Sequence, residues 1–214
     1  NLVKYTPKEK DSFLRDMYIK TLWQMVRDGQ LDVYTFAGVY EQNLKTETNG
    51  LIFNGMRFMT EGLLYYIPKE TVKQKAFYNK YVSSLENISW KRLRSAKSGS
   101  EAQKNWYNQF VKIARTPGSL KKLDSLLSGR TKLRGFKIDQ DKRWGLIYQL
   151  SRFNYSKSLQ LIKTEGKKDK SSSGVKMVMV SKAAIPNWDS KLVFLNKMTS
   201  KDSKLTYDQF SSLA

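Results

Sequence analysis

The chain has 214 residues, of which 40% are hydrophobic, and its 39 lysines and arginines exceed its 19 aspartates and glutamates by a formal net charge of +20. A globular chain of this length buries roughly 70% of the surface of its unfolded form, so its stability requires neither a metal nor a disulfide. The absence of cysteine and histidine excludes disulfides, thiolate ligands and the Ser–His and Cys–His nucleophile pairs. Only carboxylate or lysine chemistry remains open, and the spacing of the acids indicates no convergent pair.

The chain has no stretch that approaches the roughly 20 apolar residues of a membrane span. Its first residues, Asn1 to Tyr5, are too short and too polar for a signal peptide, and there is no initiator methionine. We therefore expect a processed protein or a piece of a longer one, and no membrane partner. Nothing in the composition indicates a compartment.

The positive charge allows two interpretations. It is typical of a surface that binds nucleic acid or an anionic membrane. It is also typical of a lysine-rich solvated surface, balanced by an acidic partner domain. Because the basic residues are spread over the whole length, we favour the second interpretation.

The first two apolar stretches predict consecutive helices. Thr6-Pro7-Lys8-Glu9 combines a capping threonine, a first-turn proline and an N3 glutamate, so we expect the first helix to begin there. Gly29 is its expected stop. The apolar positions recur at steps of three and four residues, as on one helix face: Leu14, Tyr18, Leu22 and Met25, then Val33, Phe36, Ala37, Tyr40 and Leu44.

The middle of the chain continues this pattern. A third helix is expected from about Leu51 to Ile67, where Pro68 ends it and opens a longer, charged helix that reaches roughly Arg94. Ser98-Gly99-Ser100-Glu101 is a second capping box, and the helix that follows breaks at Pro117-Gly118. A short leucine-rich helix is closed by Gly129.

The last third also predicts helices. The segment 130–138 is the longest irregular connection, and 166–173 is a Lys/Ser-rich loop or helix start. Three further capping signals are Asp139 before Trp144, Asn187 after Pro186, and Thr206-Tyr207-Asp208-Gln209 near the end. Helices are expected around these apolar residues: Ile147 and Tyr148, Leu159 and Ile162, Val175 to Lys182, and Trp188 to Leu195.

Together these stretches predict an all-α protein of roughly eleven helices in a single domain over 1–214. Consecutive helices with short links pack as antiparallel pairs, and many pairs in series form a curved array of the HEAT/armadillo superhelical kind. No clean sequence period is visible, so any repeats are degenerate.

Neither a GxxxxGK[ST] nor a GxGxxG phosphate loop is present. The stretch Trp90-Lys91-Arg92-Leu93-Arg94 combines aromatic and basic residues, as single-strand nucleic-acid binders do. Cations at a helix C-terminus, where the macrodipole favours them, are the simpler interpretation. Nucleic acid is thus the less favoured partner.

The most specific segment runs from Leu126-Leu127-Ser128-Gly129 to Asp139-Gln140-Asp141-Lys142-Arg143-Trp144. It predicts a helix with a glycine stop, an irregular link, an Asp cap and a helix whose tryptophan enters the core. Arg143 is expected to pair with a nearby carboxylate or with helix-end carbonyls.

This arrangement resembles the C-terminal helical domain of the aminopeptidase N-like zinc aminopeptidases, the gluzincin family. There, a Leu-Leu-x-Gly turn, a short link and an Asp-x-Asp-x-Arg-Trp helix start recur together. Other stretches are similar to that domain in the same order along nearly the whole chain: Leu22 to Leu31, Leu44 to Asn49, Lys168 to Gly174, Lys182 to Pro186, and Lys191 with Leu195.

The zinc motif His-Glu-x-x-His with its downstream Glu, and the amine-binding Gly-x-Met-Glu-Asn strand, are absent. In that family both belong to the preceding domains. The resemblance therefore implies a C-terminal piece of a longer metallopeptidase, a hydrolase, with no catalytic residue or cofactor in this chain and zinc in the missing catalytic domain.

The resemblance further implies an accessory role. In such enzymes the helical domain covers the catalytic domain and limits which peptides enter. The implied partners are the N-terminal and catalytic domains of the parent chain and peptide substrates. The implied cavity-facing or domain-contact residues are Glu47, Tyr65, Tyr66 and Arg143.

Each of these residues also has a structural alternative. Glu47 would cap the third helix, one of the adjacent Tyr65 and Tyr66 would pack while the other faces outward, and Arg143 would form an ion pair. For the whole chain, the alternative is a free-standing basic helical array that binds nucleic acid or an acidic protein.

Overall fold

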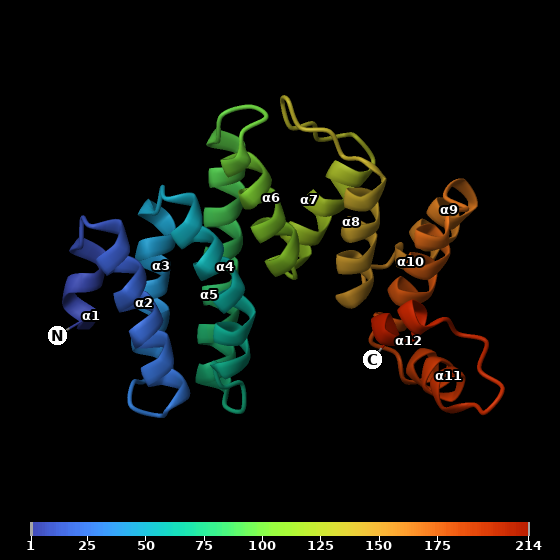
Figure 1. Cartoon of the computed structure of the whole chain (residues 1–214), viewed down its shortest axis with the longest axis horizontal. Helices are drawn as coiled ribbons and strands as arrows, with labels where there is room; N and C mark the ends of the chain where they lie inside the picture. The colour runs from blue at the N-terminus through green and yellow to red at the C-terminus, as the bar shows by residue number, and fades with distance from the viewer. Residues whose placement is uncertain (1, 214) are drawn as a thin grey trace. The chain divides into compact units, whose positions relative to one another are not determined.

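A computed structural model describes residues 2–213, and over this range the protein is all α (Figure 1). It has twelve α-helices and one 3-10 helix there, with no strand beyond an isolated bridge between Leu133 and Phe136. The predicted fold class is confirmed, whereas the curvature of the predicted array stays a prediction. The chain forms two compact units, 1–113 and 114–214. Whether they act as the single predicted domain is likewise untested.

The first unit contains six α-helices and the 3-10 helix, and neighbouring long helices are joined by short turns. Figure 1 shows α2 and α3, then α4 and α5, running in opposite directions on either side of such turns. The bounds are α1 Leu2–Tyr5, the 3-10 helix Thr6–Lys8, α2 Ser12–Arg27, α3 Val33–Thr46, α4 Gly50–Tyr66, α5 Val72–Ser95 and α6 Glu101–Ile113.

The predicted start of the first long helix is wrong. Thr6 to Lys8 form a separate 3-10 turn, and the Thr6 hydroxyl donates back to the Leu2 carbonyl at 2.7 Å instead of capping a helix. The cap of α2 is Asp11, whose carboxylate accepts from the backbone N–H groups of Phe13 and Leu14. The predicted stop is confirmed, because Gly29 has a φ of +71° that favours glycine.

Two other starts differ from the prediction by a few residues. Pro68 ends α4 as expected, but α5 is opened by Thr71 and Gln74, which form a reciprocal capping box. At α6 the Ser100 hydroxyl accepts from Gln103 N–H, and the Gln103 side chain accepts from Gly99 N–H. Helices thus begin near both predicted positions, but residues two or three positions further along the chain form the caps.

The core of the first unit combines large apolar side chains with a buried hydrogen-bond network. Tyr40 of α3 places its hydroxyl 2.6 Å from Thr60 Oγ1 of α4. Gln109 Nε2 of α6 donates to the same Thr60 oxygen at 3.0 Å. The three side chains are buried, so their mutual hydrogen bonds offset the cost of taking polar groups out of water. The network fixes how α3, α4 and α6 meet.

The second unit contains the other six helices, and its centre is α8. That helix packs against α7, α9 and α10, and Trp144 and Ile147 are buried there. The predicted Asp139 cap is confirmed, since its carboxylate accepts from Lys142 N–H at 3.0 Å. The bounds are α7 Pro117–Leu127, α8 Gln140–Arg152, α9 Ser158–Lys168, α10 Ser172–Ala183, α11 Trp188–Thr199 and α12 Tyr207–Leu213.

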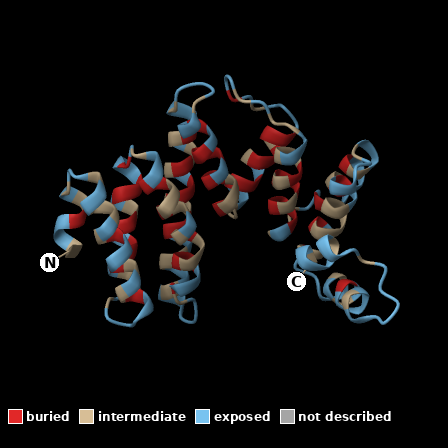
Figure 2. Ribbon diagram, in the orientation of Figure 1, coloured by how far each residue is buried: buried red, intermediate tan, exposed pale blue. Residues whose placement is uncertain are grey.

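Burial falls sharply in the last three helices (Figure 2). α10 buries only Gly174 and Ser181, α11 buries only Phe194, and α12 buries no residue. By contrast, α3 alone buries six residues. The end of the chain is therefore helical without a comparable core. No helix among residues 2–213 is both long enough and apolar enough to cross a membrane.

Candidate functional site

Glu47 lies at the point where α3 ends and α4 is about to begin. Its side chain is completely buried, with 0% of its surface exposed. Arg15 of α2 donates to both carboxylate oxygens, from Nε to Oε2 at 2.8 Å and from Nη2 to Oε1 at 3.1 Å. The backbone N–H groups of Thr48 and Asn49 donate to Oε1 at 2.9 and 2.7 Å. This carboxylate thus joins α2 to the turn between α3 and α4.

These contacts keep Glu47 ionised. Burial alone would raise the pKa of Glu47, but the hydrogen bonds from Arg15 and from the Asn49 and Thr48 N–H groups outweigh it and lower the pKa below its ordinary value. Arg92 of α5 adds a further link by donating from Nη2 to the Glu47 carbonyl at 2.6 Å. Glu47 therefore organises a helix junction, but the expectation that it caps the third helix is wrong, because the Asn49 side chain accepts from the first N–H groups of α4.

A pocket of about 370 Å³ opens beside this junction. Its walls include Glu47, Arg92, Glu101 and the rings of Phe53 and Trp106, which are tilted by 42° with centroids 4.1 Å apart. The Arg92 guanidinium lies 5.2 Å from the centre of the Trp106 ring. The pocket thus offers a cation and an aromatic wall for binding. Glu47 is no proton donor near neutral pH, because its pKa is lowered.

Tyr65 and Tyr66 lie in the last turn of α4, and they differ in their exposure. Tyr65 is 83% exposed, whereas Tyr66 is 43% exposed and packs edge-on against Trp23 with ring centroids 5.4 Å apart. Gly62 allows this approach, because a Cβ there would meet the Trp23 ring at 3.0 Å. Both rings are exposed, Tyr65 more than Tyr66, and the expectation that at most one of them faces a groove stays a prediction. Whether Tyr65 meets a substrate or a domain is untested.

Glu47 and the two tyrosines do not share one pocket. They lie at opposite ends of α4, and the 17 residues of this helix, Gly50–Tyr66, span about 24 Å at the rise of an α-helix. The sequence-predicted residues of the first unit therefore define two separate places, one at each end of this helix.

Arg143 belongs to the second unit, where it joins three helices. From α8 it donates to both carboxylate oxygens of Glu165 in α9, at 2.7 and 2.5 Å, and to the carbonyl of Leu127 at the end of α7, at 3.0 Å. The expected pairing with a carboxylate or a helix-end carbonyl is confirmed, since both are present. The hydrogen bond from Arg143 is the main cause of the lowered pKa of Glu165, whose side chain is buried.

The neighbouring Trp144 completes this junction. Its Nε1–H donates to Asp169 at 2.7 Å, and Asp169 also accepts from the Ser171 hydroxyl at the start of α10. The hydrogen bonds from Ser171 and Trp144 lower the pKa of Asp169. The Arg-Trp pair therefore connects α7, α8, α9 and the start of α10.

The residues of this chain do not fit a zinc site. The sequence has no histidine or cysteine, and among residues 2–213 no three acidic side chains lie close enough to hold a metal ion. No step of a zinc-dependent reaction can be assigned to them.

Sequence analysis missed the partners that define these sites. Arg15 lies 32 residues before Glu47, Arg92 lies 45 residues after it, and Glu165 lies 22 residues after Arg143. No local pattern connects such pairs, because only the packing of helices brings them together. For Glu47, the local signal was an acid at the end of a predicted helix, directly before Thr48 and Asn49.

These features define an all-helical protein with buried Arg–Glu junctions between helices. No known protein-family profile matches the chain. It is 24% identical over 184 residues to aminopeptidase N from Streptomyces lividans, an alignment that covers 85% of this chain. The alignment covers 20% of the relative, so the chain spans about a fifth of that protein's length. This weak homology is consistent with a fragment of such a protein.

Proposed function

We propose that this chain is the accessory, non-catalytic helical domain of a zinc aminopeptidase, where it covers the active site and controls which peptides reach it. The observation that carries the proposal is the extent of the similarity. It runs along 85% of this chain but only 20% of an aminopeptidase N. The motifs shared with the helical domain of that family also occur in the same order here.

The catalytic chemistry would lie elsewhere in the parent protein. Since the residues of this chain do not fit zinc, the metal and its ligands would belong to a separate catalytic domain. The partners of this chain would then be that domain, the N-terminal domain of the parent, and peptide substrates.

A gating role needs shape and charge more than reactive groups. The net charge of +20 would attract the carboxylates of a peptide at long range. Tyr65 offers an aromatic contact at the end of α4 because its side chain is largely exposed. Buried pairs such as Arg15–Glu47 would hold the helices that present such side chains.

The first test is to read the coding sequence upstream of Asn1. The proposal expects a His-Glu-x-x-His motif with a downstream Glu, preceded by Gly-x-Met-Glu-Asn. A start codon and signal region immediately upstream would overturn it.

The second test measures gating in the full-length parent protein. Tyr65→Ala should raise KM for a decapeptide while leaving hydrolysis of a small aminoacyl anilide unchanged, since the small substrate needs no contact with this chain. Tyr207→Ala is the matched control, because Tyr207 is equally exposed but lies on α12. Equal effects of Tyr65→Ala on both substrates would contradict a gating contact at Tyr65.

One observation favours a second candidate, a basic array that binds an anionic macromolecule. Residues 114–214 contain 21 lysines and arginines but only 8 aspartates and glutamates. If random-sequence DNA were the partner, its affinity would fall steeply and linearly on a log–log plot against salt. A flat plot, or no binding near 150 mM salt, would remove this candidate.

A further inference from the structure

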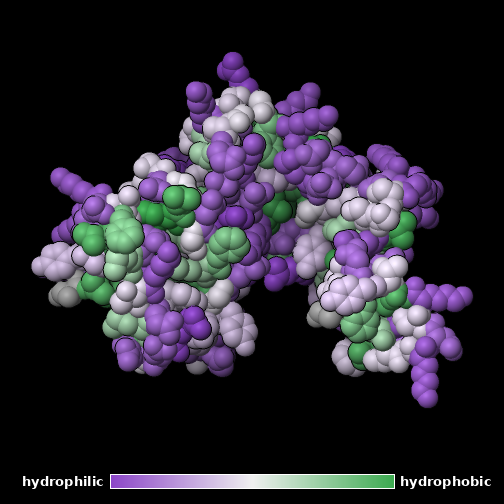
Figure 3. Space-filling view, viewed as in Figure 1, coloured by the Kyte–Doolittle hydropathy of each residue, from purple (hydrophilic) through white to green (hydrophobic). Residues whose placement is uncertain are grey.

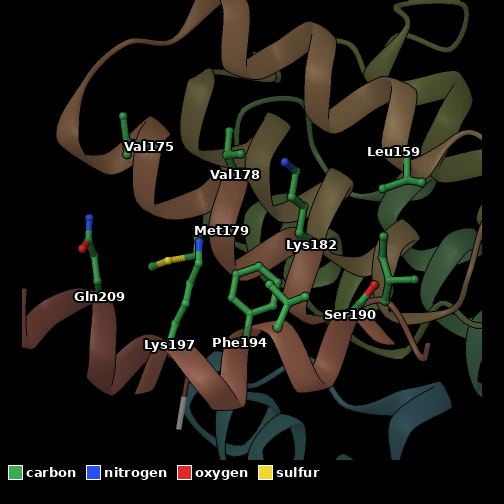
Figure 4. A pocket seen from close by; sticks show the side chains of 11 residues that line it. Leu159, Val175, Val178, Met179, Lys182, Ser190, Phe194, Lys197 and Gln209 are labelled. Atoms are coloured by element: carbon green, nitrogen blue, oxygen red, sulfur yellow. The ribbon is translucent and has the colours of Figure 1, made fainter. Parts of the chain in front are cut away.

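The four helices at the end of the chain surround an open apolar groove. Two adjoining hollows, of about 450 and 480 Å³, share Leu159 of α9 with Val178 and Lys182 of α10. Figure 4 shows side chains that line the first of them, with Met179 of α10 next to the Phe194 ring of α11. We call the two hollows together the C-terminal groove, and we define it by these residues and by Val175, Ile162 and Val193.

Several apolar side chains of the C-terminal groove are exposed, whereas Ile162 and Phe194 are buried. Leu159 is 64% exposed, and Val175 and Val193 are each 52% exposed. The run Val175 to Val180 is apolar on nearly every side of α10, a pattern typical of a fully buried helix. Here Met177, Val178, Met179 and Val180 are only half-buried. Figure 3 accordingly shows green apolar surface over the last helices.

Lysines surround this apolar surface. Lys163 and Lys167 of α9, Lys182 of α10 and Lys197 of α11 line the two hollows, and neither hollow is lined by an aspartate or a glutamate. Among the described residues, none of the four ammonium groups takes part in an ion pair, although Lys197 also lies over the Phe194 ring. The groove is therefore apolar inside and positive at its edges.

The charge of the groove restricts what can cover it. A second copy of this chain would bring another net charge of +20 to a positive surface, so self-association is disfavoured. Nucleic acid needs cations for its phosphates but gains little from exposed valine and leucine. A flat bilayer does not fit a concave surface. An amphipathic helix with acidic flanks fits both the apolar interior and the positive edges of the groove. Its apolar side chains would fill the groove, and its carboxylates would pair with the lysines.

We propose that the C-terminal groove is a docking site for an acidic amphipathic helix of a partner protein. Apolar side chains at positions i, i+3, i+4 and i+7 of that helix would cover Leu159, Val175, Val178 and Val193. Its acidic residues would pair with Lys163, Lys167, Lys182 and Lys197. This proposal does not rest on the aminopeptidase proposal, since the groove lies wholly within residues 158–213.

The test uses the full 214-residue chain and a fluorescein-labelled synthetic helix of about 18 residues, with leucines at the four-position pattern and glutamates elsewhere. Fluorescence anisotropy measures its binding. One control peptide has the same composition in scrambled order, and another carries lysine in place of glutamate. Binding of the amphipathic acidic peptide, with at least about tenfold weaker binding of both controls, is expected.

Paired variants locate the site. Lys163→Glu/Lys182→Glu and Leu159→Ser/Val175→Ser should each weaken binding at least about fivefold. The charge control is Lys121→Glu/Lys132→Glu, which makes the same change at two exposed lysines of the same unit outside the groove. The apolar control is Leu51→Ser in the first unit, where Leu51 is exposed. Both controls should bind like the unchanged chain.

The other outcomes overturn the proposal. Equal binding of the scrambled peptide, or an equal loss in Lys121→Glu/Lys132→Glu, would mean diffuse attraction to the basic surface. Failure of the peptide to bind, together with sedimentation of the chain on vesicles of phosphatidylglycerol, would assign the groove to a membrane. Failure to bind either probe would leave the groove without a docking role. None of these results would alter the test of the upstream coding sequence.

Discussion

Helices α3 and α10 are both rich in apolar residues, yet they end in different surroundings. α3 buries six residues, including Phe36, Tyr40 and Leu44, between its neighbours in the first unit. α10 buries only the small Gly174 and Ser181, and its valines and methionines remain partly exposed. Apolar composition alone therefore does not tell whether a helix supplies core or surface.

The two units also differ in their net charge. Residues 1–113 contain 18 basic and 11 acidic residues, whereas residues 114–214 contain 21 and 8. The first unit buries polar side chains that hydrogen-bond to one another, as in the network of Tyr40, Thr60 and Gln109. The second unit keeps a larger excess of cations at its surface, next to uncovered apolar side chains.

The largest expected effect concerns core size. Phe36→Ala should lower the free energy of unfolding by about 3–5 kcal/mol, because the ring is fully buried and a cavity would remain. Phe194→Ala should cost less than Phe36→Ala, since this ring, although buried, borders the open groove. Urea unfolding with amide hydrogen exchange measures both. Equal losses would show that α11 belongs to a core as complete as that of α3.

The next effect tests the buried junction and its pH dependence. Glu47→Gln should lower the free energy of unfolding by about 3 kcal/mol near neutral pH, because the Arg15 guanidinium loses its buried partner. The pKa of Glu47 is lowered in the folded chain. A lowered folded pKa stabilises the protein above the unfolded pKa, and this stability is lost as the pH falls through the folded pKa.

The unchanged chain should therefore lose stability as the pH falls below about 4.5, the ordinary value for glutamate. Glu47→Gln should flatten this dependence in the first unit. Glu165→Gln is the matched variant for the second unit, since Arg143 lowers the pKa of Glu165 in the same way. Denaturant midpoints between pH 3 and pH 7 measure the effect. An unaltered pH profile in both variants would contradict these assignments.

A smaller effect concerns backbone conformation. Gly29→Ala should destabilise by about 1 kcal/mol, because Gly29 has a positive φ that alanine rarely adopts. Gly38→Ala makes the same chemical change inside α3, where the added methyl would meet no atom within 4 Å. It should stabilise by about 0.5–1 kcal/mol. Thermal unfolding distinguishes the two signs, and a shared sign would refute the explanation.

The smallest effect is at the groove. Leu159→Ser should change the free energy of unfolding by no more than about 0.5 kcal/mol, because the side chain is mostly exposed. Ile162→Ala, three residues away on α9 but buried, should cost about 2 kcal/mol or more. A large loss in Leu159→Ser would mean that the groove is closed in solution.

Local sequence determined the helices and most of their ends. Asp139, Asn187 and the Thr206–Gln209 pair cap helices where they were predicted to do so, because each bond joins residues three positions apart. The errors at Thr6 and Pro68 arose where a stronger nearby cap was present, Asp11 in one case and Thr71 with Gln74 in the other. Which of two neighbouring residues caps a helix depends on the backbone conformation before that helix.

The sequence by itself determined an all-α protein with an excess of positive charge, because helical periodicity, caps and composition act over a few residues. Only the tertiary structure decided which charged side chains are buried and with which partners they pair. Glu47 was visible as a helix-end acid, but its pairing with Arg15 and its link to Arg92 depend on helices far apart in the chain. Tertiary structure also left the valines of α10 uncovered, since burial depends on which neighbours arrive and how closely they pack.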